Sequence, residues 1–180
     1  PFGATYQADH EYYAGLDFGQ TVDFTVMPIF DKTANVQVEL LRLNRLPWAE
    51  MRRQIRERCA YWHVKVLWPE ENSMSANLEE LKREFSEAEL TTEIVPFRTT
   101  NESKIQQASS LHESLHERGL KLLNIPEQRR EMMAFQSKQT PLGAWQLAAA
   151  PSEHDDIVIG DMLGNGAMQA PAGLGITFPS

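Results

Sequence analysis

Apolar residues fall into two repeating patterns along the chain, and together these patterns predict strands that alternate with helices. Tyr12 to Leu16 is a short apolar run, and the runs over 24–30 and 36–43 are separated by turn residues. We therefore expect two or three antiparallel strands, joined by tight turns, at the start of the fold. Further strands are predicted over 64–68, 92–97 and 120–125, and a hairpin over 136–147 that turns at 141–143.

Helical periodicity is clearest where Trp48, Met51, Ile55, Cys59 and Trp62 follow one another at intervals of three and four. This spacing places the five side chains on one face of an amphipathic helix. The residue before the first tryptophan is a proline, which costs little in the first turn of a helix. Further helices are predicted over 77–85, 103–118, 126–135 and 154–163.

Strands separated by helices predict parallel pairing and an α/β layer fold, and the antiparallel opening makes the sheet mixed. We expect a lead-in segment over 1–11, one domain over 12–163 and a flexible C-terminal tail over 164–180, which is rich in Gly, Pro and Ala. Gly160 and Asp161 interrupt the last helical pattern, so we expect that helix to be short. Because the first residue is a proline, we also expect the chain to be a piece of something longer.

Composition narrows the class of protein. Of 180 residues, 42% are hydrophobic and 23% are charged, which is the balance of an ordinary globular domain. Cys59 is the lone cysteine, so an intrachain disulfide and a thiolate zinc cage are excluded, and a reducing compartment inside the cell fits best. No apolar run reaches the roughly 20 residues of a membrane span, and no secretory leader opens the chain.

The charge balance is acidic. Seventeen Lys and Arg stand against 25 Asp and Glu, which gives a formal net charge of −8 at pH 7. A protein whose task is to coat nucleic acid is usually basic. Local patches set the field at a binding site, however, so the acidic total excludes strong non-specific binding of DNA rather than all contact with it.

Acidic residues stand where apolar elements end or begin. Asp17 closes the first predicted strand, Glu70 and Glu71 follow the fourth, and Asp155 and Asp156 open the last helix. Each acid alone also fits a solvated turn or a helix N-terminus. Ligands of open α/β sheets bind beyond the carboxyl ends of the strands, so these acids can meet at one edge. Grouped carboxylates repel one another unless cations neutralise them, and Mg²⁺ or Mn²⁺ are the expected partners.

Four short segments carry a resemblance to a known family. They are Gly15-Leu16-Asp17-Phe18-Gly19 with Asp23 just after, Glu70-Glu71-Asn72-Ser73, the stretch over 96–104 that ends in Thr-Asn-Glu-Ser-Lys, and His154-Asp155-Asp156. In this order of elements the chain resembles the RNase H-like nucleases, and among them the C-terminal nuclease domain of the large terminase subunit of tailed phages. The resemblance covers roughly residues 12–163 and implies a mixed central sheet flanked by helices.

The resemblance also implies an activity and its site. It implies a metal-dependent endonuclease that cuts concatemeric double-stranded DNA during viral packaging in the host cytoplasm, by two-metal phosphodiester hydrolysis with Mg²⁺ or Mn²⁺. Asp17, Glu70 and Asp156 are the expected ligands, with Glu71 and Asp155 left open as alternatives. Lys104 is either a catalytic residue near the scissile phosphate or an ordinary surface lysine. His154 is expected to stand behind the ligands rather than among them.

Basic residues are the candidates for holding DNA, and phosphate contacts carry no sequence code, so little base preference is expected. The candidates are Arg42, Arg45, Arg52, Arg53, Arg98 and Lys104. Glu50 and Glu57 are interleaved with the arginines over 52–56, so ion pairs on a solvated helix face are the competing interpretation. Trp145, beside the predicted turn at 141–143, is the aromatic residue considered for DNA contact.

The chain lacks the phosphate-binding motif of P-loop ATPases, which bears on its expected partners. No phosphate-binding motif G-x-x-x-x-G-K-[ST] occurs. The resemblance therefore implies a separate N-terminal ATPase domain, with the portal and the small terminase subunit as further partners.

Three alternatives remain at this stage. Asp17-x-Gly19-x-Thr21 also resembles the first phosphate loop of actin-like ATPases, but a second Gly-rich loop and about twice this length are missing. A four-way-junction resolvase shares the nuclease scaffold. A catalytically weak, nuclease-like module that docks the portal or small subunit is the alternative without enzymatic activity.

Overall fold

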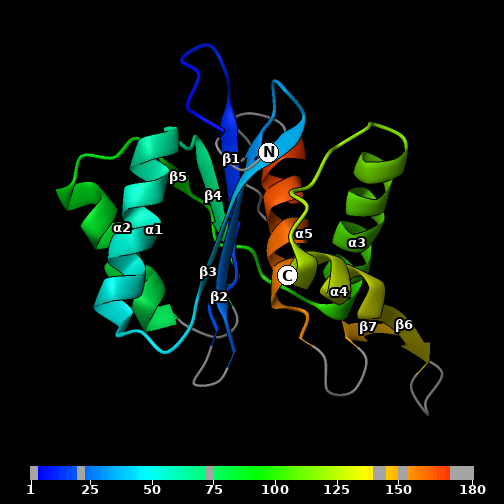
Figure 1. Ribbon diagram of the computed structural model, residues 1–180. Coiled ribbons are helices and arrows are strands. Elements are labelled where there is room, and N and C mark those ends of the chain that lie inside the picture. The colour runs from blue at the N-terminus through cyan, green and yellow to red at the C-terminus, as the bar shows by residue number, and fades with distance from the viewer. Residues whose placement is uncertain (1–3, 20–22, 72–74, 140–144, 150–153, 171–180) are drawn as a thin grey trace.

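A five-stranded mixed sheet forms the centre of the fold in the computed structural model (Figure 1). The structure describes residues 4–19, 23–71, 75–139, 145–149 and 154–170. Side chains between 136 and 149 are outside this description. The strands are β1 (Tyr12–Leu16), β2 (Thr25–Asp31), β3 (Val36–Leu43), β4 (Val66–Pro69) and β5 (Glu93–Ile94). Their order is β3-β2-β1-β4-β5, with antiparallel pairing among β1–β3 and parallel pairing of β4 with β1 and of β5 with β4. The predicted α/β class with a mixed sheet is confirmed.

The antiparallel opening is fixed by the turn between β2 and β3. Asp31 accepts a hydrogen bond at Oδ1 from the Ala34 N–H over 2.9 Å, and Asn35 adopts the left-handed conformation at a φ of 56°. Asparagine tolerates that conformation better than most residues. Every residue of β1 and β2 is buried, because helices cover both faces of the sheet there, and this explains their continuous apolar runs.

Helices lie on both faces of the sheet. In Figure 1, α1 (Trp48–Trp62) and α2 (Ser75–Glu87) cover one face, and α5 (Asp156–Gln169) lies on the other with α3 (Asn101–His116) and α4 (Pro126–Ala134) outside it. The α1 stripe of Met51, Ile55, Cys59 and Trp62 is buried as its spacing predicts. A small second sheet pairs β6 (Phe135–Gln139) with β7 (Trp145–Ala149), which matches the predicted hairpin, whose turn at 141–143 is outside the described residues.

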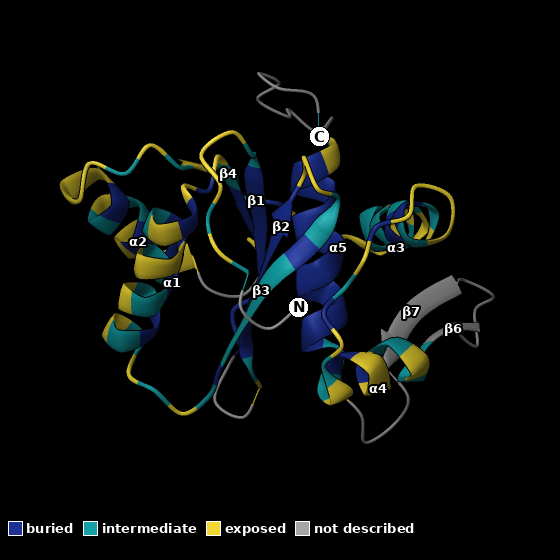
Figure 2. Ribbon diagram, turned by 45° about the horizontal axis from the view of Figure 1, so that its top comes forward, coloured by how far each residue is buried: buried dark blue, intermediate teal, exposed yellow. Residues whose placement is uncertain are grey.

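The last helix is the most deeply buried of the described helices: it is buried from Asp156 to Met168, as its dark colour in Figure 2 shows, and exposed at Gln169. It approaches β1 so closely that a Cβ atom on Gly15 would lie 2.3 Å from both Gly160 O and Gly164 N. The expectation of a short helix ending at Leu163 is wrong, because α5 continues to Gln169. The glycines that suggested an early end instead permit close packing against the sheet. The first residues of the expected tail are therefore helical, and 171–180 are outside the described residues.

One predicted strand does not form. The segment 120–125 contributes a single bridge between Lys121 and Val36. It cannot extend the sheet further, because the Leu123 N–H donates to the side-chain Oε1 of Gln37 rather than to the backbone of β3. None of the described helices is long and apolar enough to cross a membrane.

Candidate metal centre

The sheet topology brings Asp17 and Glu70 side by side. They directly follow β1 and β4, which are adjacent and parallel with Leu16 paired to Pro69, and the Glu70 N–H donates to Leu16 O over 2.9 Å. Asp17 is also tied to β2 by two backbone hydrogen bonds with Val26, each 2.9 Å long. The Glu70 carboxylate lies close enough to Asp17 to raise the pKa of that residue. Two of the strand-end acids therefore lie side by side at this edge, and their binding of a metal ion remains a prediction.

The third acid comes from the start of α5. The Phe24 N–H, just before β2, donates to Oδ2 of Asp156 over 3.2 Å and so holds this carboxylate at the same edge. Asp17 and Asp156 are each 9% exposed. Asp156 thus comes from the far end of the chain, and it lies near enough to Asp17 for its charge to raise the pKa of that residue.

The pKa values of two acidic residues at this edge, Asp17 and Asp156, are raised by burial and by repulsion from neighbouring acids. Burial raises the pKa of Asp17 well above its usual range, and the negative charges of Glu70, Asp156 and Asp155 raise it further. Burial also raises the pKa of Asp156, against the opposing effect of the Phe24 N–H. Carboxylates that are costly to ionise together become stable as anions when a divalent ion neutralises them.

Asp156 also belongs to a set of three possible metal ligands at the start of α5. Asp23, His154 and Asp156 each offer one ligand atom, and these atoms lie within 4.8 Å of one another. Both Asp23 and His154 are exposed, so an ion could reach them from solvent. The two carboxylates suit Mg²⁺ and Mn²⁺, whereas the imidazole of His154 is a ligand that transition metals prefer over Mg²⁺. From the sequence, Asp23 is named only as part of a motif, and His154 is predicted to support the metal ligands rather than to bind the ion itself.

The alternative ligands have different surroundings. Glu71 is exposed, and its N–H donates to Phe97 O over 2.9 Å. Side chains of neighbouring extended residues alternate in direction, so with Glu70 beside Asp17 we expect the Glu71 side chain to point away from Asp17. Asp155 lies close enough to raise the pKa of Asp17, but its Oδ2 is 3.4 Å from Nζ of Lys104.

Lys104 is held beside the acids by the first turn of α3. The Thr100 side chain accepts from the Ser103 N–H, and the Ser103 hydroxyl accepts from the Thr100 N–H, which is a capping box. This cap fixes where α3 begins and so where Lys104 projects. Its ammonium group also lies 5.7 Å from the centre of the Phe135 ring. A positive charge therefore stands next to the predicted ligands.

Two of the predicted DNA-binding arginines are available at this edge. Arg45 follows β3 and Arg98 follows Phe97, which forms a bridge with Glu70. Both side chains are exposed, and neither has an ion-pair partner in the described part of the chain. Since β3 and β5 are the two outer strands, these cations flank the acids on opposite sides.

The other predicted arginines have partners within the protein. Arg52 pairs with Glu84 over 2.8 Å, and Arg53 pairs with acids of its own helix at Glu50 and Glu57. Arg42 Nη2 is 3.5 Å from Glu131, and its guanidinium lies 3.4 Å from the centre of a phenylalanine ring. Their contact with DNA remains a prediction. The Trp145 side chain is outside the described residues.

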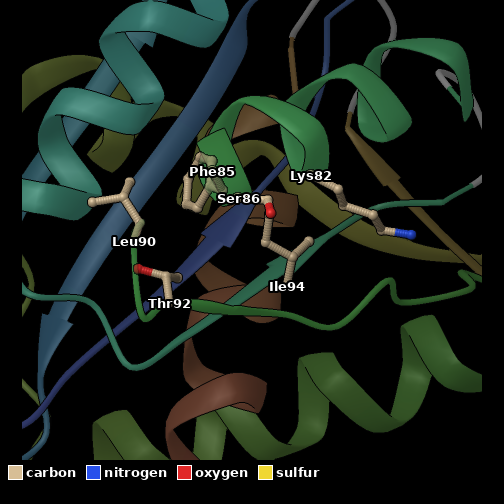
Figure 3. Close-up of a pocket in the computed structure, with 6 residues that line it drawn as sticks. All are labelled: Lys82, Phe85, Ser86, Leu90, Thr92 and Ile94. Atoms are coloured by element: carbon tan, nitrogen blue, oxygen red, sulfur yellow. The ribbon is translucent and has the colours of Figure 1, made fainter. Parts of the chain in front are cut away.

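A separate hollow of about 310 Å³ lies between α2 and the edge strand β5 (Figure 3). Its lining residues are Lys82, Phe85, Ser86, Leu90, Thr92 and Ile94. None of these described lining residues is acidic.

Solved structures with a similar fold include nuclease domains of large terminase subunits. The large terminase nuclease of thermophilic phage G20c matches with a TM-score of 0.82 and 22% identity, over 90% of this chain and 84% of that one, and the same nuclease with bound magnesium matches with a TM-score of 0.76. A mutant nuclease domain of the large terminase subunit gp2 of bacterial virus Sf6, with manganese and beta-thujaplicinol, matches with a TM-score of 0.70 and 12% identity, over 92% and 91%.

The HK97 bacteriophage large terminase matches with a TM-score of 0.66 and 13% identity, over 91% of this chain and 40% of that one. No protein-family model and no curated protein matches the chain. The fold that the resemblance of the four sequence segments implies is thus confirmed by the structural matches. The sequence identities of these matches, 12% to 22%, are too low to establish the fold by sequence comparison alone. This chain has the RNase H-like fold of the large terminase nuclease domains.

Proposed function

We propose that the chain is the metal-dependent endonuclease domain of a viral DNA-packaging terminase, and that it cuts concatemeric double-stranded DNA by two-metal phosphodiester hydrolysis. The observation that carries this proposal is the convergence of Asp17, Glu70 and Asp156, from three separate elements, at the edge where β1 and β4 end. Structural neighbours that are nuclease domains, two of them with magnesium or manganese, support it.

The site residues divide into those that hold metal and those that hold DNA. Asp17, Glu70 and Asp156 would bind the ions, with Asp23 and His154 as additional ligands of the same centre. Two Mg²⁺ or Mn²⁺ ions about 4 Å apart supply charge stabilisation for the attacking and leaving oxygens of a phosphodiester. The burial of Asp17 and Asp156 keeps bulk water from competing for their oxygens.

Lys104 would act on the phosphate rather than on the metal. Its ammonium lies beside Asp155, within reach of the acidic group, and can donate hydrogen bonds to a phosphate oxygen. Arg45 and Arg98 would hold the backbone on either side of the cleavage position. Such contacts read no base, so the expected cleavage has little sequence preference. Because the chain is acidic as a whole, binding depends on these local cations and on the bound metal.

The proposed function places this domain in a longer terminase protein that acts with other packaging proteins. This chain covers 40% of the HK97 large terminase, which supports the proposal that the domain works as one part of a longer protein. We expect an ATPase domain as its covalent neighbour and the portal and small terminase subunit as its partners, in the host cytoplasm.

Plasmid nicking with Mn²⁺ tests the proposal. Asp17→Asn keeps the size of the side chain and removes its charge, so it should lower nicking by on the order of a hundredfold or more. The matched control is Asp9→Asn, because Asp9 is an exposed aspartate in the segment before β1. Nicking that survives Asp17→Asn, or that falls equally in both variants, would contradict the assignment. Absence of nicking in the unmodified chain would favour the docking module instead.

A further inference from the structure

Glu131, on α4, contacts the first turn of α5 from outside that helix. It is 4% exposed, and its Oε2 accepts a hydrogen bond from the Ile157 N–H over 2.8 Å. The first N–H groups of a helix have no partner within the helix, and the side chain of Asp155, at the N-cap position, does not supply one. Glu131 therefore caps α5 in place of a local residue, with a negative charge where the helix dipole favours one.

The same glutamate is connected to the metal-ligand candidate by a second route. Its Oε1 lies 3.5 Å from Arg42, whose guanidinium lies 3.4 Å from the centre of the Phe24 ring. The Phe24 N–H donates in turn to Asp156 Oδ2 over 3.2 Å. Since Asp156 directly precedes Ile157, these five residues form a closed ring of contacts around the Asp156 carboxylate.

We infer that Glu131 is a positioning residue of the metal centre, which holds the start of α5 so that Asp156 faces Asp17. This inference rests on the proposed function, because it concerns how a proposed ligand is oriented. Without the Glu131 carboxylate, the Ile157 N–H loses its acceptor and Arg42 loses its counter-ion. Both supports of the Asp156 backbone and side chain are then weakened together. Groups that orient metal ligands in this way commonly change metal affinity by about 10- to 100-fold.

Mn²⁺ binding to the folded chain, measured by calorimetry, tests this role independently of cleavage. Glu131→Ala should weaken Mn²⁺ binding by about 10- to 100-fold. Glu131→Gln should recover most of the affinity, because its amide oxygen can still accept from the Ile157 N–H. The matched control is Glu127→Ala, one helical turn earlier on α4, which should bind Mn²⁺ like the unmodified chain. Circular dichroism establishes that each variant is folded.

A folded Glu131→Ala variant that binds Mn²⁺ as tightly as the unmodified chain would overturn the inference. If that variant does not fold, Glu131→Asp decides, because it keeps the charge beside Arg42 and shortens the reach to Ile157. It should weaken Mn²⁺ binding several-fold, and unchanged binding would overturn the inference.

Mn²⁺ binding to the Asp156→Asn variant distinguishes a failure of the proposed function from a failure of this inference. If the unmodified chain binds no more Mn²⁺ than Asp156→Asn does, the metal centre itself is wrong. If Asp156→Asn loses binding while a folded Glu131→Ala keeps it, only the positioning role is wrong.

Discussion

Asp161 makes the stability of this protein depend on pH in an unusual direction. It lies in the middle of α5 with no exposed surface. Its Oδ1 accepts from Gln37 Nε2 over 2.9 Å and its Oδ2 accepts from Gln128 Nε2 over 2.7 Å. Burial nevertheless outweighs these two donors and raises the pKa of Asp161 to about 8, with a further contribution from the charge of Glu131.

The sign of the effect follows from proton binding. An aspartate in the unfolded chain has a pKa near 3.9. Between about pH 4 and pH 8 the folded chain therefore keeps a proton on Asp161 that the unfolded chain releases. The free energy of unfolding should fall as pH rises through this window, by up to about 1.4 kcal/mol per pH unit, or on the order of 5 kcal/mol across it.

Asp161→Asn isolates this contribution, because an amide has nearly the same shape and does not titrate. Its NH₂ group also offers a donor near Gln128 Oε1, a buried atom that has no hydrogen-bond partner within the described structure. Urea unfolding at pH 5, 6, 7 and 8, with EDTA present, gives the free energy of unfolding of both proteins. We expect the unmodified chain to lose about 1 kcal/mol per pH unit relative to the variant.

Comparing the two proteins matters because burial also raises the pKa values of Asp17, Asp156 and Glu131, and these groups titrate in both. A difference in stability that stays constant with pH, or grows in favour of the unmodified chain, would refute the reasoning. It would mean that Asp161 is ionised in the folded protein and that the two amide donors outweigh its burial.

Three further predictions test the site and the packing. Glu70→Gln should reduce Mn²⁺-dependent nicking by on the order of a hundredfold or more, whereas Glu71→Gln should leave it within about threefold; equal losses would contradict the choice of Glu70. Gly15→Ala should lower the free energy of unfolding, measured in urea, by about 3 kcal/mol or more, because the added Cβ would enter the backbone of α5. A loss below about 1 kcal/mol would show that the contact relaxes easily. Arg45→Ala and Arg98→Ala should each weaken binding of duplex DNA and lower its dependence on salt in a binding titration, and an unchanged salt dependence would exclude phosphate contact at that position.

The acids at the ends of strands could be predicted from the sequence because their meeting needs few assumptions. A buried run followed by an acid, repeated in parallel strands, places the acids at one edge whatever the loops do. Choosing between Glu70 and Glu71 depends on the register of the strands, and the pairing of Leu16 with Pro69 favours Glu70 because it places Glu70 opposite Asp17. Asp23 was harder to recognise as a ligand candidate. It belongs to the turn that leads back into β2, where no periodic pattern says which way a side chain points.

The last helix shows where local reasoning fails. Gly160 and Asp161 read locally as a weakened helix, because glycine and a buried acid each destabilise an isolated one. The fold reverses both effects through residues far away in the chain. Gln37 is 124 positions from Asp161 and supplies its hydrogen bond, while the missing side chain of Gly15 makes room for the helix backbone. Only the folded sheet brings these groups together, so a helix that is unfavourable by itself becomes the element that carries Asp156 to the proposed metal centre.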